Sequence, residues 1–170
     1  MKILIIAYTD LKMDPRPYRQ INCLNKLYSV YTVGKSNSGL EKSFFQLKKH
    51  SFIINIFRIF ILKIGFNKWY YWDKHKKNLL KLIDKNNFDL VIAHEIKTLP
   101  LALRIAKGSP VILDAHEYSP NNFDDDFLWR FFLKKHFIWL CKNYLPKIDK
   151  LVSVSPGIVD KYSSEFNTKS

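Results

Sequence analysis

The sequence predicts an α/β domain in which helices cover both faces of a parallel sheet. Short runs rich in Ile, Val and Leu recur along the chain, and segments with helical spacing of apolar residues separate them. Strands that alternate with helices form parallel sheets, and strands buried on both faces are apolar throughout. The expected layout is Rossmann-like. A chain of 170 residues with 47% apolar residues fits one domain, residues 1–170.

Each element has a local signal. Strands are expected at residues 2–8, 28–34, 44–47, 89–93, 111–114 and 150–154, and helices at 15–27, 68–83, 98–106, 127–145 and 158–166. Asp14 can cap the first helix, and Pro15 suits its first turn, where a missing N–H costs nothing. Gly108 marks the end of the 98–106 helix, and the acids 124–126 are expected to cap the 127–145 helix.

The chain is strongly basic, with a formal net charge of +13. Such a charge favours nucleic acid, anionic lipid or phosphorylated ligands as partners. We expect no nucleic-acid partner, because the aromatic residues are interleaved with Ile and Leu at helical spacing and no recognised binding signature occurs. Cys23 and Cys141 stand in separate apolar, helix-like contexts, as expected of reduced core residues in a cytosolic protein.

Residues 68–83 are expected to form a basic amphipathic helix. The residues assigned to a membrane surface are Trp69, Tyr70, Lys74, Lys77 and Lys81. Trp and Tyr rings suit the headgroup region of a bilayer, and lysines neutralise lipid phosphates. A core helix with a solvated basic back explains the same pattern equally well. The preceding apolar segment, 51–66, is too short to span a bilayer comfortably.

Two strands end in the same three residues, Ala-His-Glu. His94 and Glu95 follow one strand, and His116 and Glu117 follow another. Because ligands of open α/β sheets bind beyond the carboxyl ends of the strands, both pairs are expected to face one crevice.

These side chains allow other interpretations. A hydrogen-bonded structural histidine would explain His116. The two His-Glu pairs have residue types suited to zinc or iron, but adjacent residues on a strand point to opposite sides. We therefore expect no metal site.

The start of the first helix is a candidate anion site. Arg16 and Arg19 add positive charge to the free N–H groups and the positive dipole end of the helix. Pairing of both arginines with Asp10 and Asp14 is an equally good interpretation from residue type alone.

Four motifs occur in order along most of the chain. They are Asp14-Pro15-Arg16 with Arg19, the strand ending in His94-Glu95 before Leu99-Pro100, the phrase Asp114-Ala115-His116-Glu117, and the strand at 149–155 with Tyr162. Together they resemble the amino-terminal domain of GT-B glycosyltransferases of the family 4 type (glycosyl transferase group 1). That group builds bacterial surface polysaccharides and glycolipids. The family often has Gly before the second strand, where this chain has Tyr28-Ser29.

The resemblance implies transfer of a sugar from a nucleotide-sugar donor to a glycan or lipid-linked acceptor, usually with retention. No cofactor or metal is implied. His116 would lie nearest the reacting sugar, and Asp114 would orient it or contribute charge. The implied acceptor-binding residues are Arg16, Arg19, His94, Glu95 and Glu117.

In this family a second, carboxyl-terminal domain binds the nucleotide-sugar. We expect that domain to lie outside residues 1–170, in cis or as a separate subunit, and residues 1–170 alone to be inactive. The expected location is cytoplasmic and peripheral, on the anionic inner face of the membrane. The alternative is a non-catalytic basic adaptor at the membrane surface, or a subunit of a split enzyme.

Overall fold

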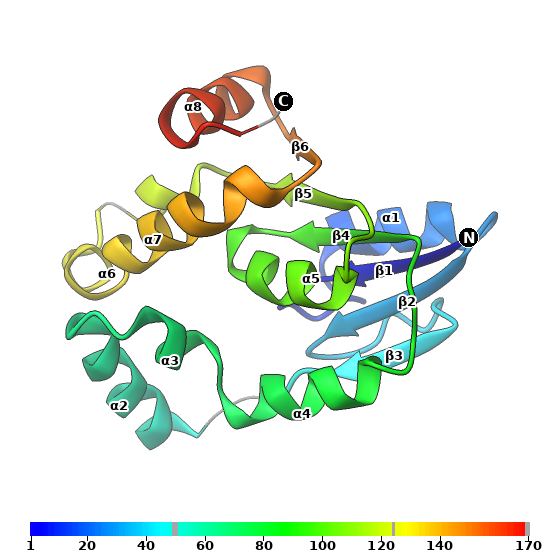
Figure 1. The fold of residues 1–170 in the computed structure, drawn as a ribbon, viewed down its shortest axis with the longest axis horizontal. Coiled ribbons are helices and arrows are strands. Elements are labelled where there is room, and N and C mark those ends of the chain that lie inside the picture. The colour runs from blue at the N-terminus through cyan, green and yellow to red at the C-terminus, as the bar shows by residue number, and fades with distance from the viewer. Residues whose placement is uncertain (49–50, 124, 169–170) are drawn as a thin grey trace.

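The computed structural model describes residues 1–48, 51–123 and 125–168. One parallel sheet contains six strands in the order β3-β2-β1-β4-β5-β6 (Figure 1). The strands are β1 (Lys2–Ile6), β2 (Ser29–Gly34), β3 (Ser43–Gln46), β4 (Leu90–His94), β5 (Val111–Ala115) and β6 (Lys150–Ser153). Each neighbouring pair runs parallel. The predicted α/β fold with a Rossmann-like sheet is confirmed.

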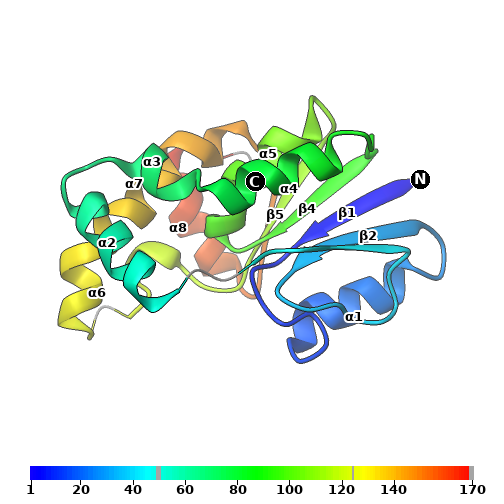
Figure 2. The same cartoon turned by 90° about the horizontal axis from the view of Figure 1, so that it is seen from below.

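Helices lie on both faces of the sheet. They are α1 (Pro15–Leu24), α2 (Phe52–Lys63), α3 (Asn67–Tyr71), α4 (Lys74–Ile83), α5 (Leu99–Ala106), α6 (Phe127–Phe132), α7 (Lys134–Tyr144) and α8 (Pro156–Phe166). Short 3₁₀ turns are η1 (Ile96–Thr98), η2 (Ser119–Asn121) and η3 (Leu145–Lys147). Figure 2 shows α1 on one face of the sheet and α4 and α5 on the other.

The alternation of side chains along β1 divides the core in two. Leu4 and Ile6 belong to the larger cluster, which also contains residues of α4, α5, α7 and α8. Ile3 and Ile5 belong to the smaller cluster, which contains Ile21 of α1. Successive residues of a strand point to opposite faces, so a continuous apolar run is what a doubly covered strand requires.

The strand order reverses direction between β1 and β4, which are neighbours in the sheet but distant in sequence. The chain leaves β1 for α1 on one face and leaves β4 for α5 on the opposite face. At such a switch point a crevice opens beyond the carboxyl ends of the strands. Both Ala-His-Glu phrases lie at this edge.

The single helix expected at 68–83 is wrong, because the chain forms α3 and α4 with a break at Trp72 and Asp73. Asp73 is extended, with ψ of 171°, and its side chain accepts a hydrogen bond from the backbone N–H of Lys76 to cap α4. The same carboxylate lies 3.0 Å from Nη1 of Arg58 in α2. Asp73 thus separates α3 from α4, because it caps α4 and is also held by the ion pair with Arg58.

The helix expected at 127–145 is also divided, into α6 and α7, with Leu133 between them at φ −108°. Asp126 caps α6 as expected, because its carboxylate accepts hydrogen bonds from the backbone N–H groups of Leu128 and Trp129. Asp124, another of the three acids expected to cap this helix, lies outside the described residues. The core position expected for Cys23 is wrong, since this cysteine is exposed, whereas Cys141 is buried.

Gly34 tests the packing at the end of β2. A Cβ atom placed there would lie 2.8 Å from Cγ of Leu11, which is fully buried. We expect Gly34→Ala to lower the free energy of unfolding by about 1–3 kcal/mol in urea denaturation, because an overfilled core forces its neighbours to move. The control is Gly157→Ala in α8, where no atom lies within 4 Å of the new Cβ. Equal stability of the two variants would contradict this packing.

Candidate active site

A two-pronged ion pair joins the start of α1 to the end of β5. Asp14 caps α1 by accepting a hydrogen bond from the backbone N–H of Arg16, 3.3 Å away. The Arg16 side chain donates from Nε to Oδ2 of Asp114 at 3.0 Å and from Nη2 to Oδ1 of the same residue. The Asp114 side chain is only 6% exposed. This geometry uses the charge of Arg16 to neutralise a buried carboxylate.

His94 lies directly beside Asp114, because the two residues are register partners on β4 and β5. Burial lowers the pKa of His94 to about 4, although Asp114 acts in the opposite direction. The imidazole is therefore neutral near pH 7. Its Nε2 lies 2.9 Å from Oε1 of Gln20 in α1, so Nε2 carries the proton and donates it to that oxygen.

His116 completes a short chain of imidazoles. Its Nε2 lies 3.1 Å from Nδ1 of His94. Because Nδ1 of His94 carries no proton, Nε2 of His116 is the donor in this hydrogen bond. The opposite ring nitrogen, Nδ1, lies 3.5 Å from Oε1 of Glu95. One side of the ring is thus held by His94, and the other faces a carboxyl group.

Glu95 reaches His116 because its backbone leaves the strand conformation. Its φ of 69° is uncommon for a residue other than glycine. The Glu95 carboxyl accepts hydrogen bonds from the backbone N–H of His116 at 2.9 Å and from Oγ of Ser119 at 3.4 Å. Burial raises the pKa of Glu95. The expectation that His94 and Glu95 point to opposite sides assumed strand geometry at Glu95, and that geometry does not persist.

Two predicted acceptor-binding residues lie outside this cluster. Arg19 is exposed and donates from Nε to the backbone oxygen of Pro15 at 3.1 Å. Glu117 is exposed and accepts a hydrogen bond from the side chain of Asn122. The acceptor-binding roles of both stay predictions.

Sequence reasoning missed Gln20 and Ser119, which hold His94 and Glu95. Gln20 follows Arg16 by four residues and therefore lies on the same side of α1. That spacing is the signal by which Gln20 could have been found. Ser119 belongs to η2 and carries no comparable sequence signal.

The residue types in the cluster raise the question of a metal ion. His94, Asp114 and His116 each offer one ligand atom, and these atoms lie within 4.8 Å of one another. Both Asp114 oxygens, however, accept hydrogen bonds from Arg16, and the lone pair on Nδ1 of His94 accepts one from His116. A cation would displace these bonds and lie beside a guanidinium. The arrangement fits proton handling better than metal binding.

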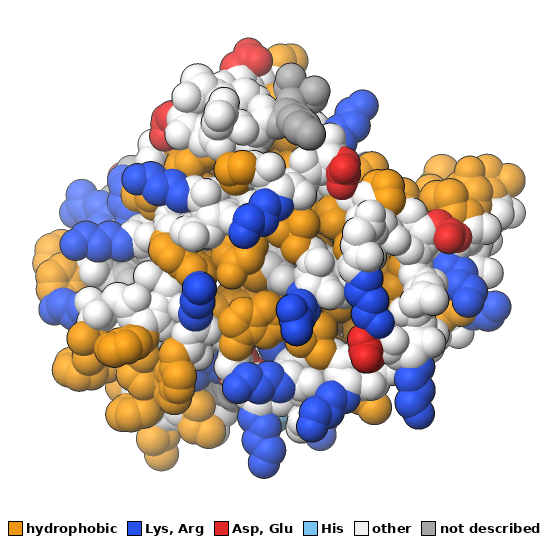
Figure 3. Space-filling model, in the orientation of Figure 1, with side chains coloured by type: hydrophobic (Ala, Val, Ile, Leu, Met, Phe, Trp, Pro, Cys, Tyr) orange, Lys and Arg blue, Asp and Glu red, His pale blue; other side chains and the backbone are white. Residues whose placement is uncertain are grey.

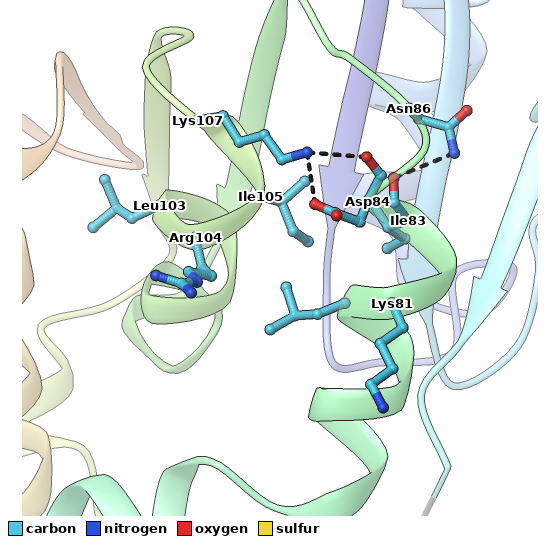
Figure 4. A pocket seen from close by; sticks show the side chains of 9 residues that line it. Lys81, Ile83, Asp84, Asn86, Leu103, Arg104, Ile105 and Lys107 are labelled. Carbon is cyan, nitrogen blue, oxygen red and sulfur yellow. Dashed lines mark hydrogen bonds and ion pairs between the residues drawn. The ribbon is translucent and has the colours of Figure 1, made fainter.

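One pocket in the described residues lies away from the strand ends. It has a volume of about 470 Å³ between α4 and α5. Figure 4 shows Lys107 reaching across it to Asp84, whose backbone oxygen accepts a hydrogen bond from Nζ at 2.9 Å. Its lining contains no member of the histidine cluster, so we do not assign it to the site.

The five residues predicted at a membrane surface come from two helices. Trp69 and Tyr70 belong to α3, whereas Lys74, Lys77 and Lys81 belong to α4. Trp69 and the three lysines are exposed, but Tyr70 is half-buried under the Arg58 guanidinium, 5.0 Å from its ring centroid. The break at Asp73 therefore places the predicted aromatic residues and the predicted lysines on separate short helices.

Two other helices expose a large apolar surface. We call it the apolar ridge; it comprises Ile53, Ile54, Ile56, Phe57 and Phe60 of α2 and Phe127, Leu128 and Phe131 of α6, all exposed. Figure 3 shows hydrophobic side chains gathered at the lower left, bordered by basic ones. Within the described residues no helix is long and apolar enough to cross a membrane. The sequence indicated an apolar segment here but not its exposure.

A model of Glycosyltransferase Family 4 matches residues 25–170. The chain belongs to glycosyltransferase family 4. The matched segment contains four residues of the cluster, namely His94, Glu95, Asp114 and His116, whereas Arg16 and Gln20 lie in α1 before it begins. A comparison with curated proteins found no match.

The neutral state of His94 predicts how stability depends on pH. The folded pKa of about 4 lies below the usual value of 6.5, so the unfolded chain binds more protons between these values. The corresponding stability is present above pH 6.5 and is lost as the pH falls towards 4, by at most about 3 kcal/mol. Urea denaturation at pH 7 and pH 4.5 should therefore show a smaller loss for His94→Gln than for the wild type.

His136 provides an internal comparison, because burial also lowers its pKa to about 4 and it lies in α7, outside the cluster. The free energy of unfolding of the His94→Gln variant should still fall at low pH, because His136 remains buried. Equal pH dependence of the wild type and His94→Gln would contradict a buried neutral His94.

Proposed function

We propose that the chain is the acceptor-binding half of a glycosyltransferase. It transfers a sugar from a nucleotide-sugar donor, held by a second domain in cis or by a separate subunit, to a glycan or lipid-linked acceptor. The pathway is synthesis of a bacterial surface polysaccharide or glycolipid. Family membership supports the transferase activity, and the histidine cluster at the switch point of the sheet supports the position of the reaction.

His116 is the residue assigned to the acceptor proton. Glycosyl transfer breaks the bond between the anomeric carbon and the donor phosphate, and the attacking acceptor hydroxyl loses its proton. With Nε2 of His116 bonded to His94, the Nδ1 edge beside Glu95 is the edge that can receive a proton. The His116 side chain is 26% exposed, whereas that of His94 is 2% exposed. Substrate therefore meets His116, and His94 positions it.

One observation carries the assignment above all. Nε2 of His116 is held by His94, which Gln20 fixes in turn, and Nδ1 faces Glu95, whose carboxyl is fixed by the His116 backbone and Ser119. A histidine with only a packing role needs no such pair of neighbours around a partly exposed ring. Preorganised groups of this kind are typical of sites that stabilise a transition state.

The apolar ridge supports peripheral attachment to a membrane. Isolated exposed apolar residues are common, but a contiguous group of large ones marks an interaction surface. Basic residues near the ridge, together with the net charge of +13, suit an anionic lipid surface. A non-catalytic adaptor at the membrane would use the same surface, and the activity of cluster variants separates the two functions.

The catalytic assignment predicts the effect of His116→Ala. In a preparation that combines the chain with its nucleotide-sugar-binding half, kcat should fall by about 10²- to 10⁴-fold, because a general base contributes about that much. The acceptor KM should change little. Lys85→Ala, at an exposed lysine that follows α4 and lies outside the histidine cluster, is the control and should retain turnover. Full turnover in His116→Ala would remove the catalytic assignment, and absence of turnover in the wild type would favour the adaptor.

Membrane attachment predicts binding to anionic liposomes. In flotation assays Ile53→Ser/Phe60→Ser should bind at least about tenfold more weakly than the wild type, because two exposed apolar side chains no longer enter the bilayer. The control is Met13→Ser/Leu27→Ser, which removes apolar residues that are 76% and 78% exposed elsewhere on the molecule. Tighter binding to single-stranded DNA than to anionic liposomes at the same salt would contradict the proposal.

A further inference from the structure

A second pocket opens at the carboxyl edge of the sheet, on the face opposite α1. It has a volume of about 450 Å³, and its walls come from β-strand ends, α2, α3, α4 and η1. Among the residues that the structure describes, its charged lining is cationic except for one side chain: Lys35, Lys48, Arg58, Lys76 and Lys97 against Asp73. We call it the basic pocket. Neither the histidine cluster nor any predicted site residue except Tyr70 contributes to it.

One acidic residue, Asp73, partly neutralises the positive charge of the basic pocket. Asp73 binds Arg58 through Oδ2 at 3.0 Å and Lys76 through the same oxygen at 2.8 Å. Lys76 also donates to the backbone oxygen of Tyr71, and burial lowers its pKa. One carboxylate thus faces two buried cations. The local charge is therefore positive even without the other lysines of the pocket.

Three further lysines extend from the ends of three strands. Lys35 follows β2, Lys48 follows β3, and Lys97 lies in η1 after β4. The backbone at two of them is fixed, because Lys35 N–H donates to Thr9 at 2.8 Å and the Lys97 oxygen accepts from Tyr71 at 3.0 Å. Cations gathered around a concave site strengthen the local field and attract anions. A ligand with more than one negative charge would balance the positive charge of the pocket.

An apolar groove adjoins the basic pocket. It has a volume of about 390 Å³ and shares Arg58 and Asp73 with the pocket. Ile54, Phe57, Trp69 and Trp72 supply its apolar walls. Ile54 and Phe57 also belong to the apolar ridge, so the groove leads from the basic pocket to the surface assigned to the membrane. Charge at one end and hydrocarbon at the other match an amphiphile with a phosphate head.

We propose that the basic pocket binds the phosphate or diphosphate of a lipid-linked acceptor and that the adjoining groove binds the start of its hydrocarbon chain. This inference rests on the proposed function, which it narrows to an acceptor with a phosphate group. Lys97 and Glu95 are two residues apart on the turn after β4. The turn therefore connects the phosphate site on one face with His116 on the other.

Calorimetry with inorganic diphosphate and with dodecyl phosphate tests the pocket directly, without turnover. Both probes should bind the wild type more weakly as salt rises, and dodecyl phosphate should bind at least tenfold more tightly because its chain enters the groove. Lys35→Gln/Lys97→Gln should weaken binding of both probes at least tenfold. The control Lys26→Gln/Lys85→Gln makes the same change in net charge with exposed lysines outside the pocket, and should change affinity less than twofold.

The outcomes are distinct. An equal loss of affinity in the two double-lysine variants would show that only the net charge of the chain matters. That result would overturn the phosphate site. Equal affinity for the two probes would mean that the pocket binds a soluble phosphate and that the groove binds no hydrocarbon chain. If neither probe binds while His116→Ala still abolishes turnover on a neutral acceptor, the inference fails and the proposed function stands. If both probes bind but the chain combined with its nucleotide-sugar-binding half shows no turnover, the phosphate site stands and the proposed function fails.

Discussion

The ion pair between Arg16 and Asp114 is the constraint on which the site depends. An isolated carboxylate buried at the end of β5 would cost several kcal/mol, and a two-pronged guanidinium offsets much of that cost. Because β4 lies between β1 and β5, Arg16 reaches across the end of β4 to Asp114. The start of α1 is thereby held over His94. The pair fixes the start of α1 against Asp114, while Ile21 of the same helix packs in the core.

Proton positions in the cluster follow from that arrangement. α1 covers His94, burial keeps its imidazole neutral, and Gln20 on the same helix determines which nitrogen carries the proton. The tautomer of His94 then determines which nitrogen of His116 is the donor. The unusual backbone of Glu95 provides the remaining contact, at a conformational cost of about 1–3 kcal/mol. Such strain at a strand end is typical of functional sites, because it places a side chain where regular structure cannot.

The strands and the site edge were predictable because their signals are local. Runs such as Val91–Ala93 and the Ala-His-Glu endings require only strand periodicity and the rule that ligands bind beyond strand ends. The break at Asp73 has a local signal that the sequence analysis missed, because Asp is a favoured N-cap residue. The ion pair of Asp73 with Arg58, fifteen positions earlier in the sequence, has no such signal. The φ of Glu95 and the exposure of α2 likewise depend on contacts between distant segments. Periodicity shows that a helix is apolar, but not whether another element covers it.

We propose two functional surfaces on either side of one strand edge, the histidine cluster on the α1 face and the basic pocket on the opposite face. The central claim is that a neutral His94 orients His116. Nitrogen-15 NMR of histidine-labelled protein at pH 7 tests it most directly. We expect His94 to be neutral and protonated on Nε2, with Nε2 of His116 also protonated. A doubly protonated His94, or one protonated on Nδ1 alone, would contradict it.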